Sequence, residues 1–206
     1  FRVPVVSLGN LTWGGSFKTS LAVFLVRRLQ PMRIAVLVRG YGADEVAMLE
    51  EALQNTTAKV HVGKDRSAVL ERIQDEYDLV LLDDGFQHRK VRRDLDILLM
   101  NARNPFSSRA LIPCGSLREP VSGVKRADMI VFTNTDTVPE DLTASIRKKN
   151  KESVLLSAYY KPRCFIDLKG AEYPLETIVA EDCACFCAIA FPRGFLATLH
   201  GLNIVP

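Results

Sequence analysis

Short apolar runs alternate with stretches of helical periodicity along most of the chain. The runs are rich in Val, Ile and Leu and predict buried strands at 3–8, 33–38, 59–62, 79–83, 95–100, 129–132 and 154–158. The periodic stretches predict helices at 19–30, 44–54, 66–77 and 140–149. This alternation is typical of an α/β fold in which helices flank a mostly parallel sheet.

The pattern becomes irregular after residue 158. We expect a core over 1–158 and a small irregular C-terminal part over 159–206, which holds a strand at 185–190 and a helix at 193–200. Within the core, residues 101–126 are rich in Pro, Arg and Ser. This composition indicates an ordered functional loop.

The chain has 206 residues, enough for one α/β domain with a small appendage. Its 27 basic and 24 acidic residues give a net charge of +3, which argues against a protein that coats nucleic acid. No apolar run approaches the roughly 18 residues that a membrane-spanning helix needs. Because the first residue is Phe1 rather than methionine, the lack of a leader or anchor is uninformative.

Five cysteines form an odd set without the spacing of a secreted disulfide scaffold, which favours a reducing compartment. Cys183, Cys185 and Cys187 alternate, so on a strand their side chains would share one face. Structural zinc sites usually draw thiolates from pairs two to four residues apart on turns. We therefore favour a buried strand over a metal cluster in this segment.

A candidate phosphate-binding loop follows the first predicted strand. Its sequence, GNLTWGGSFKTS at 9–20, matches the G-x-x-x-x-G-K-[ST] pattern except that Phe17 replaces the last glycine. In such a loop, backbone N–H groups point at phosphate oxygens, the lysine neutralises the outer phosphates and the hydroxyl ligates Mg²⁺. On this motif alone, an ordinary turn into a helix stays open. The candidate ATP-binding residues are Thr12, Trp13, Gly14, Gly15, Ser16, Phe17, Lys18 and Thr19.

A pair of acids ends another predicted strand. Asp83 and Asp84 follow the apolar run 79–82 and precede Gly85. Mg²⁺ prefers oxygen ligands and usually takes one or two carboxylates from such a strand end. A strand capped by solvated acids is the alternative, common for one acid and less so for two. Together the loop and the acids predict a P-loop NTPase-like fold, with both motifs converging on one metal-bridged triphosphate.

Five ordered segments are similar to those of the tetraacyldisaccharide 4'-kinase family, the lipid A 4'-kinases. They are VPVVSLGNLT at 3–12 with its following glycines and Lys-Thr pair, VRGYG at 38–42, DE at 44–45, DDGFQH at 83–88 and LIPCGSLREP at 111–120. A weaker match is AIAFPRGF at 188–195. The resemblance covers essentially the whole chain, and DDGFQH and LREP are its specific parts.

The resemblance implies a kinase that uses ATP and Mg²⁺ to phosphorylate the 4'-hydroxyl of a tetraacylated glucosamine disaccharide 1-phosphate in lipid A biosynthesis. It also implies association with a membrane surface, through a hydrophobic helix that would precede Phe1, and a truncated C-terminal lobe after the kinase core. We expect a monomer that binds no nucleic acid. In a bacterium its location would be the cytoplasmic face of the inner membrane. Trp13 in the phosphate loop resembles the plant members of the family, for which the location would be a mitochondrion.

The resemblance assigns roles to individual residues. Asp44 would be the base for the sugar hydroxyl, acting with Lys18 and His88. The alternatives are a helix N-cap for Asp44 and a surface histidine for His88. The metal ligands would be Thr19, Asp83 and Asp84, and the substrate contacts Glu45, Gln87 and Arg118.

Two basic features leave alternatives open. Arg118 could clamp a phosphate with two hydrogen bonds, or could pair with Glu119 or another nearby acid. The cluster RKVRR at 89–93 could meet the substrate 1-phosphate or anionic lipid headgroups, and a solvated helix face is at least as good an interpretation.

Three departures from the family pattern support a second hypothesis, a catalytically impaired nucleotide-binding homologue. Phe17 would be strained or would crowd the nucleotide. Asp44 follows Gly42 more closely than in bacterial relatives. The chain also ends at Pro206, before the segment that should supply a histidine partner for the base. A third hypothesis, an enzyme that phosphorylates a soluble metabolite, is disfavoured by the DDGFQH and LREP segments.

Overall fold

The computed structural model of the protein describes residues 1–14, 17–40, 42–177, 183–189 and 192–205. The chain divides into two compact units, Phe1–Ala158 and Tyr159–Pro206. Each unit is described by itself below.

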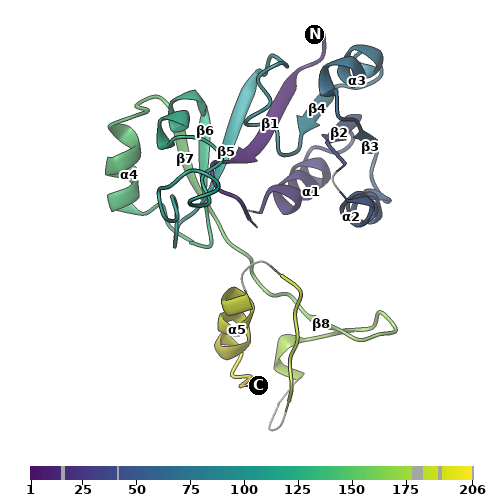
Figure 1. The fold of residues 1–206 in the computed structure, drawn as a ribbon. Helices are drawn as coiled ribbons and strands as arrows, with labels where there is room; N and C mark the ends of the chain where they lie inside the picture. The colour runs from purple at the N-terminus through teal and green to yellow at the C-terminus, as the bar shows by residue number, and fades with distance from the viewer. Residues whose placement is uncertain (15–16, 41, 178–182, 190–191, 206) are drawn as a thin grey trace. The chain divides into compact units, whose positions relative to one another are not determined.

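A sheet of seven parallel strands forms the centre of the first unit (Figure 1), in the order β3-β2-β4-β1-β5-β6-β7. The strands are β1 (Val5–Asn10), β2 (Ile34–Val38), β3 (Lys59–Val62), β4 (Leu79–Leu82), β5 (Leu95–Asn101), β6 (Met129–Thr133) and β7 (Val154–Ala158). Because β1 pairs with β4 on one side and β5 on the other, it is a central, buried strand. The expected mostly parallel sheet is confirmed.

Helices cover both faces of this sheet. On one face, α1 (Lys18–Arg28) lies beside α2 (Ala43–Leu53), and Leu49 packs with Val36 of β2. On the other face, Leu70 of α3 (Arg66–Ile73) packs with Leu37, the next residue of β2. The 3₁₀ helix η1 (Val121–Arg126) and α4 (Glu140–Arg147) cover this second face over β5 and β6. Successive residues of each strand thus feed two apolar layers.

Every helix and strand predicted within residues 1–158 is present, with some bounds displaced. β1 starts at Val5 and runs to Asn10. The preceding Pro4 has no N–H for a sheet hydrogen bond, although its carbonyl accepts one from Val80. Helix α3 ends at Ile73, before the predicted end, because Tyr77 turns into the core, where its hydroxyl contacts a ring nitrogen of His61 at 2.8 Å.

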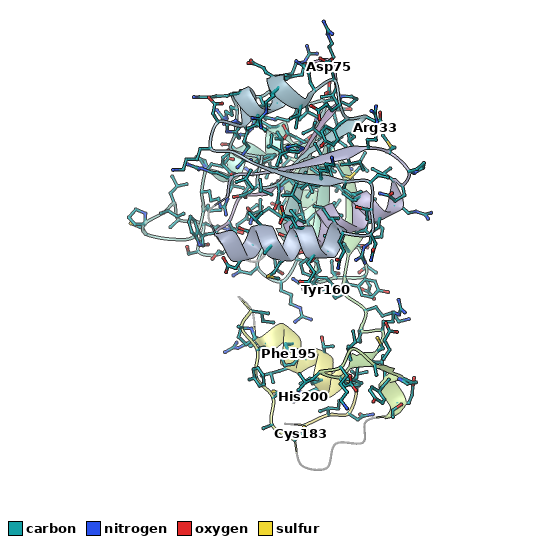
Figure 2. The ribbon with its side chains drawn as sticks, turned by 90° about the vertical axis from the view of Figure 1, so that its right-hand side faces the viewer. Arg33, Asp75, Tyr160, Cys183, Phe195 and His200 are labelled. Carbon is teal, nitrogen blue, oxygen red and sulfur yellow. The ribbon has the colours of Figure 1, made fainter. Side chains whose placement is uncertain are left out.

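The second unit consists of short elements. A two-stranded antiparallel ladder joins β8 (Phe165–Ile166) to β9 (Glu172–Tyr173), and Asp167 Oδ1 accepts from the backbone N–H groups of Lys169 and Ala171 in its turn. It is followed by the 3₁₀ turn η2 (Leu175–Thr177) and by α5 (Pro192–Gly201), which confirms the predicted helix. Figure 2 shows Phe195 and His200 on α5.

The predicted buried strand at 185–190 is wrong for the part that the structure describes. Residues 183–189 form no strand, Cys183 is half-buried, and Cys185 and Cys187 are exposed. The last predicted residue, Ala190, lies outside the described residues. Alternating small and apolar residues gave the strand period, yet no neighbouring strand pairs with them. Within the described ranges, no group of three or more His, Cys, Asp or Glu residues could hold a metal ion.

No helix among the described residues has both the length and the apolar character to cross a membrane.

Candidate active site

The carboxyl ends of β1 and β4 bring the two predicted motifs together. Ser7 is the register partner of Leu82, so the loop after Asn10 and the acids after Leu82 leave the sheet side by side. Lys18 Nζ lies 3.4 Å from Oδ1 of Asp84. The expected convergence of the loop and the acid pair is confirmed for these two side chains.

The loop between β1 and α1 is fastened to the sheet by Asn10. The Asn10 side chain is buried, its Nδ2 donates to the carbonyl of Gly14 at 3.4 Å, and its Oδ1 accepts from Lys18 Nζ at 3.3 Å. Gly14 has φ = 113°, a conformation that side chains rarely allow. Asn10 therefore orients both the loop and its lysine. Gly15 and Ser16, which the sequence predicts to bind ATP, lie outside the described residues.

Phe17 adopts the left-handed conformation directly before α1, with φ = 65° and ψ = 7°. The strain that the sequence predicted for Phe17 is therefore present in the backbone. For a residue with a side chain this conformation costs about 1–2 kcal/mol. The half-buried ring packs against the apolar cluster that contains Leu8 and Ala22. The core on the α1 face thus accommodates the ring and helps to offset the strain.

Asp83 is a buried carboxylate, only 5% exposed. Burial, together with the charges of Asp84 and Glu45, raises its pKa to about 6 against the opposing charge of Lys18. Its Oδ1 accepts from the backbone N–H of Asp84 at 2.9 Å. A cation bound here would stabilise a charge that the fold otherwise penalises, which is the chemistry expected of a metal ligand.

Asp84 is held by cations on two sides. Burial alone would raise its pKa, but the charges of Lys18 and Arg118 and their hydrogen bonds keep it below its usual value. Its backbone has φ = 51°, and its carbonyl and that of Asp83 both accept from Nη1 of the buried Arg66, at 3.1 and 2.9 Å. Arg66 thereby fixes the turn from which the two acids project.

The LREP segment pairs with the phosphate loop. Arg118 N–H donates to the carbonyl of Leu11 at 2.8 Å, and Trp13 N–H donates to that of Ser116 at 2.7 Å. Arg118 Nη1 reaches both oxygens of Asp84, at 2.7 and 2.6 Å, and its guanidinium lies 5.2 Å from the ring centre of the exposed Trp13. Of the alternatives left open for Arg118, pairing with another nearby acid is the one observed, and that acid is Asp84.

Glu119 has a different set of partners. Arg126 donates to its two carboxylate oxygens, each at 2.8 Å, and Gln87 Nε2 donates to Oε1 at 2.8 Å. The same Gln87 nitrogen donates to the carbonyl of Asn10 at 2.8 Å. Gln87 therefore lies at the base of the phosphate loop, where it joins β1 to the LREP segment.

The connection from β4 to β5 runs closely across β1. A Cβ on Gly9 would lie 2.4 Å from Cβ of Phe86 and 2.8 Å from its backbone nitrogen, so only glycine fits there. His88 follows on this connection, and its side chain is half-buried rather than fully exposed. Burial and the nearby charge of Arg66 lower its pKa, and its Nε2 has no hydrogen-bond partner among the described residues.

Asp44 and Glu45 are exposed residues in the first turn of α2. The N-cap position is occupied by Gly42, and no side chain caps the helix there. The interpretation of Asp44 as the N-cap is therefore wrong. Negative charge in a first turn favours the helix through its dipole. The charge of Glu45 is among those that raise the pKa of Asp83. Thr19 is half-buried in the first turn of α1, and Thr12 bridges to Leu117.

The basic cluster at 89–93 forms no helix, and its side chains diverge. Arg93 points inward and pairs with Asp96 at 2.8 Å, with both side chains about 10% exposed or less. Arg89 is mostly exposed and lies 3.8 Å from Oε2 of Glu119. Lys90 and Arg92 are exposed. Arg93 therefore has a structural role, while Arg89, Lys90 and Arg92 are exposed to a ligand.

Three residues that the sequence did not single out take part in this site. They are Asn10, Arg66 and Arg126. Asn10 stood within the loop motif without a role, and Arg66 stood at the start of a predicted helix. Arg126 is the last residue of the predicted functional loop at 101–126, but it lies outside every motif and nothing in the sequence distinguished it from the other arginines of that loop.

Comparison with known proteins accords with this geometry. The family model described as "Tetraacyldisaccharide-1-P 4'-kinase" matches residues 1–50 and 43–206. A "Tetraacyldisaccharide 4'-kinase" of Syntrophobacter fumaroxidans is 38% identical over 98% of this chain and 61% of its own length. A "Probable tetraacyldisaccharide 4'-kinase, mitochondrial" of Arabidopsis thaliana is 30% identical over 96% of this chain and 59% of its own. The chain thus spans about three fifths of these relatives.

Solved structures agree with the sequence matches. The crystal structure of LpxK from Aquifex aeolicus in complex with ATP has a TM-score of 0.75 and 27% identity, and the match covers 99% of this chain and 69% of that one. HypB from Helicobacter pylori, at 11% identity and a TM-score of 0.51, shares the fold alone. With the family model matching nearly all of its residues, the chain belongs to the tetraacyldisaccharide-1-P 4'-kinase family.

Proposed function

We propose that this chain provides the nucleotide-binding core of an ATP-dependent kinase that phosphorylates the 4'-hydroxyl of a tetraacylated glucosamine disaccharide 1-phosphate, a step of lipid A biosynthesis. The observation that carries the proposal is the approach of Lys18 Nζ to Asp84, 3.4 Å, at the carboxyl ends of adjacent parallel strands. Ligands of such sheets bind at this edge, where the strand order reverses. Family membership supplies the identity of the phosphoryl acceptor.

The residues that would hold ATP surround the start of α1. Lys18 would neutralise the outer phosphates, and the N–H groups at the start of α1 would favour their negative charge. The Aquifex aeolicus structure in complex with ATP supports ATP as the nucleotide of the family. The full proposed set is Thr12, Trp13, Gly14, Gly15, Ser16, Phe17, Lys18 and Thr19.

Mg²⁺ fits the same edge. Asp83, Asp84 and the hydroxyl of Thr19 offer oxygen donors, and burial raises the pKa of Asp83, a cost that a bound cation would reduce. When bound, Mg²⁺ would neutralise charge on the transferring phosphoryl group. Arg118 and Lys18 now occupy the Asp84 carboxylate, so both cations would need to turn toward the phosphates as the site fills.

The acceptor hydroxyl would be served by residues around the acid pair. We assign Asp44 as the base and His88 as an assisting group, because Glu45, next to Asp44, lies close enough to Asp83 to affect its ionisation. Glu45, Gln87 and Arg118 would contact substrate. The lowered pKa of His88 keeps its ring neutral near pH 7, so the ring can accept a proton or a hydrogen bond.

The lipid acceptor places the enzyme at a membrane surface. The exposed cations of the cluster at 89–93 suit anionic headgroups or the substrate 1-phosphate. In a bacterium this surface would be the cytoplasmic face of the inner membrane, and in a plant it would belong to a mitochondrion. We further propose a monomer without nucleic-acid partners.

A catalytically impaired homologue is the competing function. It rested partly on Phe17, whose strain is real but whose ring packs into the core cluster on the α1 face. Steric exclusion of ATP by this ring is therefore the weaker interpretation.

The test follows ³²P from γ-labelled ATP into detergent-solubilised tetraacyldisaccharide 1-phosphate. We expect labelled lipid with Mg²⁺ and a loss on the order of 10²-fold or more for Lys18→Ala. Lys149→Ala, which removes an exposed lysine after α4, is the charge-matched control and should leave transfer unchanged. ATP binding without transfer would favour the impaired homologue. Label on a water-soluble amino sugar instead of the lipid would favour the soluble-metabolite enzyme.

A further inference from the structure

Arg126, which no motif predicts, contacts two separate segments of the site. Its Nη1 and Nη2 donate to Oε2 and Oε1 of Glu119, both at 2.8 Å, as a two-pronged fork. Its guanidinium lies 4.5 Å from the ring centre of Phe86, and Nη2 lies 3.4 Å from the Phe86 carbonyl. One side chain from η1 thus holds both the LREP segment and the β4–β5 connection.

The surroundings of Glu119 hold its carboxylate in place for this fork. The Glu119 side chain is 12% exposed, and a Cβ on Gly123 would lie 2.5 Å from its Oε2, so the helix η1 leaves space for this carboxylate. Burial would raise the pKa of Glu119, but the hydrogen bonds of Arg126 and Gln87 hold it lower. The carboxylate is therefore ionised and can accept from both neighbours.

Two routes lead from this fork to the phosphate loop. In the first, Glu119 accepts from Gln87, which donates to the carbonyl of Asn10, and the Asn10 side chain accepts from Lys18. In the second, the residue before Glu119 is Arg118, whose N–H donates to the carbonyl of Leu11. Both routes end on the loop that carries the lysine.

We propose that Arg126 is a positioning residue for the phosphate site: its fork on Glu119 fixes Gln87 and the LREP segment, and through them the loop from Leu11 to Gly14 and the ammonium of Lys18. Arg126 itself touches neither nucleotide nor acceptor. The expected effect of Arg126 on ATP binding rests on the proposed function. Its effect on the loop from Leu11 to Gly14 concerns the ligand-free protein and does not depend on that function.

The variant Arg126→Lys keeps the charge and most of the stem over Phe86 while removing the fork, because lysine donates as a point charge. Its matched control is Arg93→Lys, which removes the bonds of another arginine fork, on Asp96 at the start of β5, a pair that lies outside both routes to the phosphate loop. Both variants should lower the midpoint of urea unfolding. Only Arg126→Lys should act on the loop.

The first measurement is amide hydrogen exchange of the ligand-free 206-residue chain. We expect exchange of the Trp13 and Arg118 amides, which donate to Ser116 and Leu11, to be about tenfold faster in Arg126→Lys than in Arg93→Lys. Equal exchange in the two variants would overturn the proposal. If Arg126→Lys does not fold, Glu119→Gln, which keeps the shape and removes the charge, replaces it in the same comparison.

The second measurement is ATP affinity, followed by the fluorescence of Trp13, the chain's one tryptophan. Arg126→Lys should weaken ATP about fivefold or more in the wild-type background and have no further effect in Lys18→Ala, because both act on one lysine. Additive effects would overturn the link to Lys18. If no variant binds ATP, the proposed function fails while the exchange result still decides the role of Arg126.

Discussion

Nη1 of Arg118 donates to both carboxylate oxygens of Asp84, at 2.7 and 2.6 Å, while Lys18 Nζ approaches the same carboxylate at 3.4 Å. The two cations proposed to meet the phosphates of ATP thus share one internal anion when no nucleotide is bound. Phosphate oxygens must compete with Asp84 for them. A divalent cation would ease this competition, because it would take the carboxylate as Lys18 and Arg118 turn to the phosphates.

Removing the internal anion should therefore separate nucleotide binding from catalysis. In buffer with EDTA, Asp84→Asn should bind ATP about tenfold more tightly than the wild type, since Lys18 and Arg118 lose their competing charge. With Mg²⁺ present, the same variant should lose phosphoryl transfer, because a proposed metal ligand is gone. Titration by Trp13 fluorescence and the ³²P transfer assay measure the two effects. An unchanged or weaker affinity in EDTA would show that Asp84 does not compete with phosphate.

The buried carboxylate of Asp83 predicts an unusual pH dependence of stability. Its folded-state pKa of about 6 lies above the ordinary value of 3.8. The neutral acid is favoured in the folded state, so its contribution to stability is full below about pH 4 and is lost as the pH rises through 6. One pKa unit corresponds to about 1.4 kcal/mol. The free energy of unfolding of the wild type should therefore fall by about 3 kcal/mol between pH 4 and pH 7.5 because of this group.

Asp83→Asn should remove that loss, because the amide stays neutral and its Oδ1 can still accept from the N–H of Asp84. In metal-free buffer the variant should unfold at higher urea than the wild type at pH 7.5 and at similar urea at pH 4. With Mg²⁺ added at pH 7.5, the variant should lose phosphoryl transfer, because a proposed metal ligand has lost its charge. Parallel stability curves for the two proteins across this range would mean that burial does not penalise the Asp83 charge.

Local pattern was sufficient to predict the core of this fold. The seven parallel strands are short apolar runs whose neighbours are all strands of the same sheet, so periodicity and structure coincide. The predicted strand at 185–190 was wrong for the opposite reason. An alternating segment forms a strand only where another strand pairs with it, and residues 183–189 have no such pairing. The ladder of β8 and β9 was missed because two-residue strands leave no periodicity to detect.

The site divides in the same way. Lys18 and the acid pair could be predicted, because a loop after one strand and acids after a neighbouring strand meet at one sheet edge. The partners of Arg118 and Glu119 could not be predicted from the sequence. They depend on the register in which the LREP segment pairs with Leu11 and Trp13, and that register is visible only in the structure. Arg126 was beyond reach because its role depends on a contact with Phe86, 40 residues away in sequence.

The crossing of β1 by the β4–β5 connection should make Gly9 intolerant of any side chain. A Cβ there would meet the backbone and Cβ of Phe86 at 2.4–3.2 Å, so Gly9→Ala must push this connection away and should destabilise the first unit by about 3 kcal/mol. Gly194→Ala, in α5 with open space around it, is the control and should be neutral or stabilising. Urea unfolding of both variants tests this, and equal stabilities would mean that the connection can shift freely.

Replacing Phe17 by glycine asks whether its ring blocks ATP. The ring packs with the core cluster of Leu8 and Ala22 on the α1 face, and its strained backbone already has the positive φ that a glycine would adopt. Phe17→Gly should therefore leave ATP affinity within about threefold of the wild type, roughly 0.7 kcal/mol, because the loop keeps its conformation. Stability should change little as well, since relief of about 1–2 kcal/mol of strain opposes the loss of a half-buried ring. Phe17→Leu, which keeps an apolar side chain and the strain, separates these two terms in urea unfolding. A gain in ATP affinity of tenfold or more in Phe17→Gly would show instead that the aromatic ring obstructs the nucleotide, and would revive the impaired homologue.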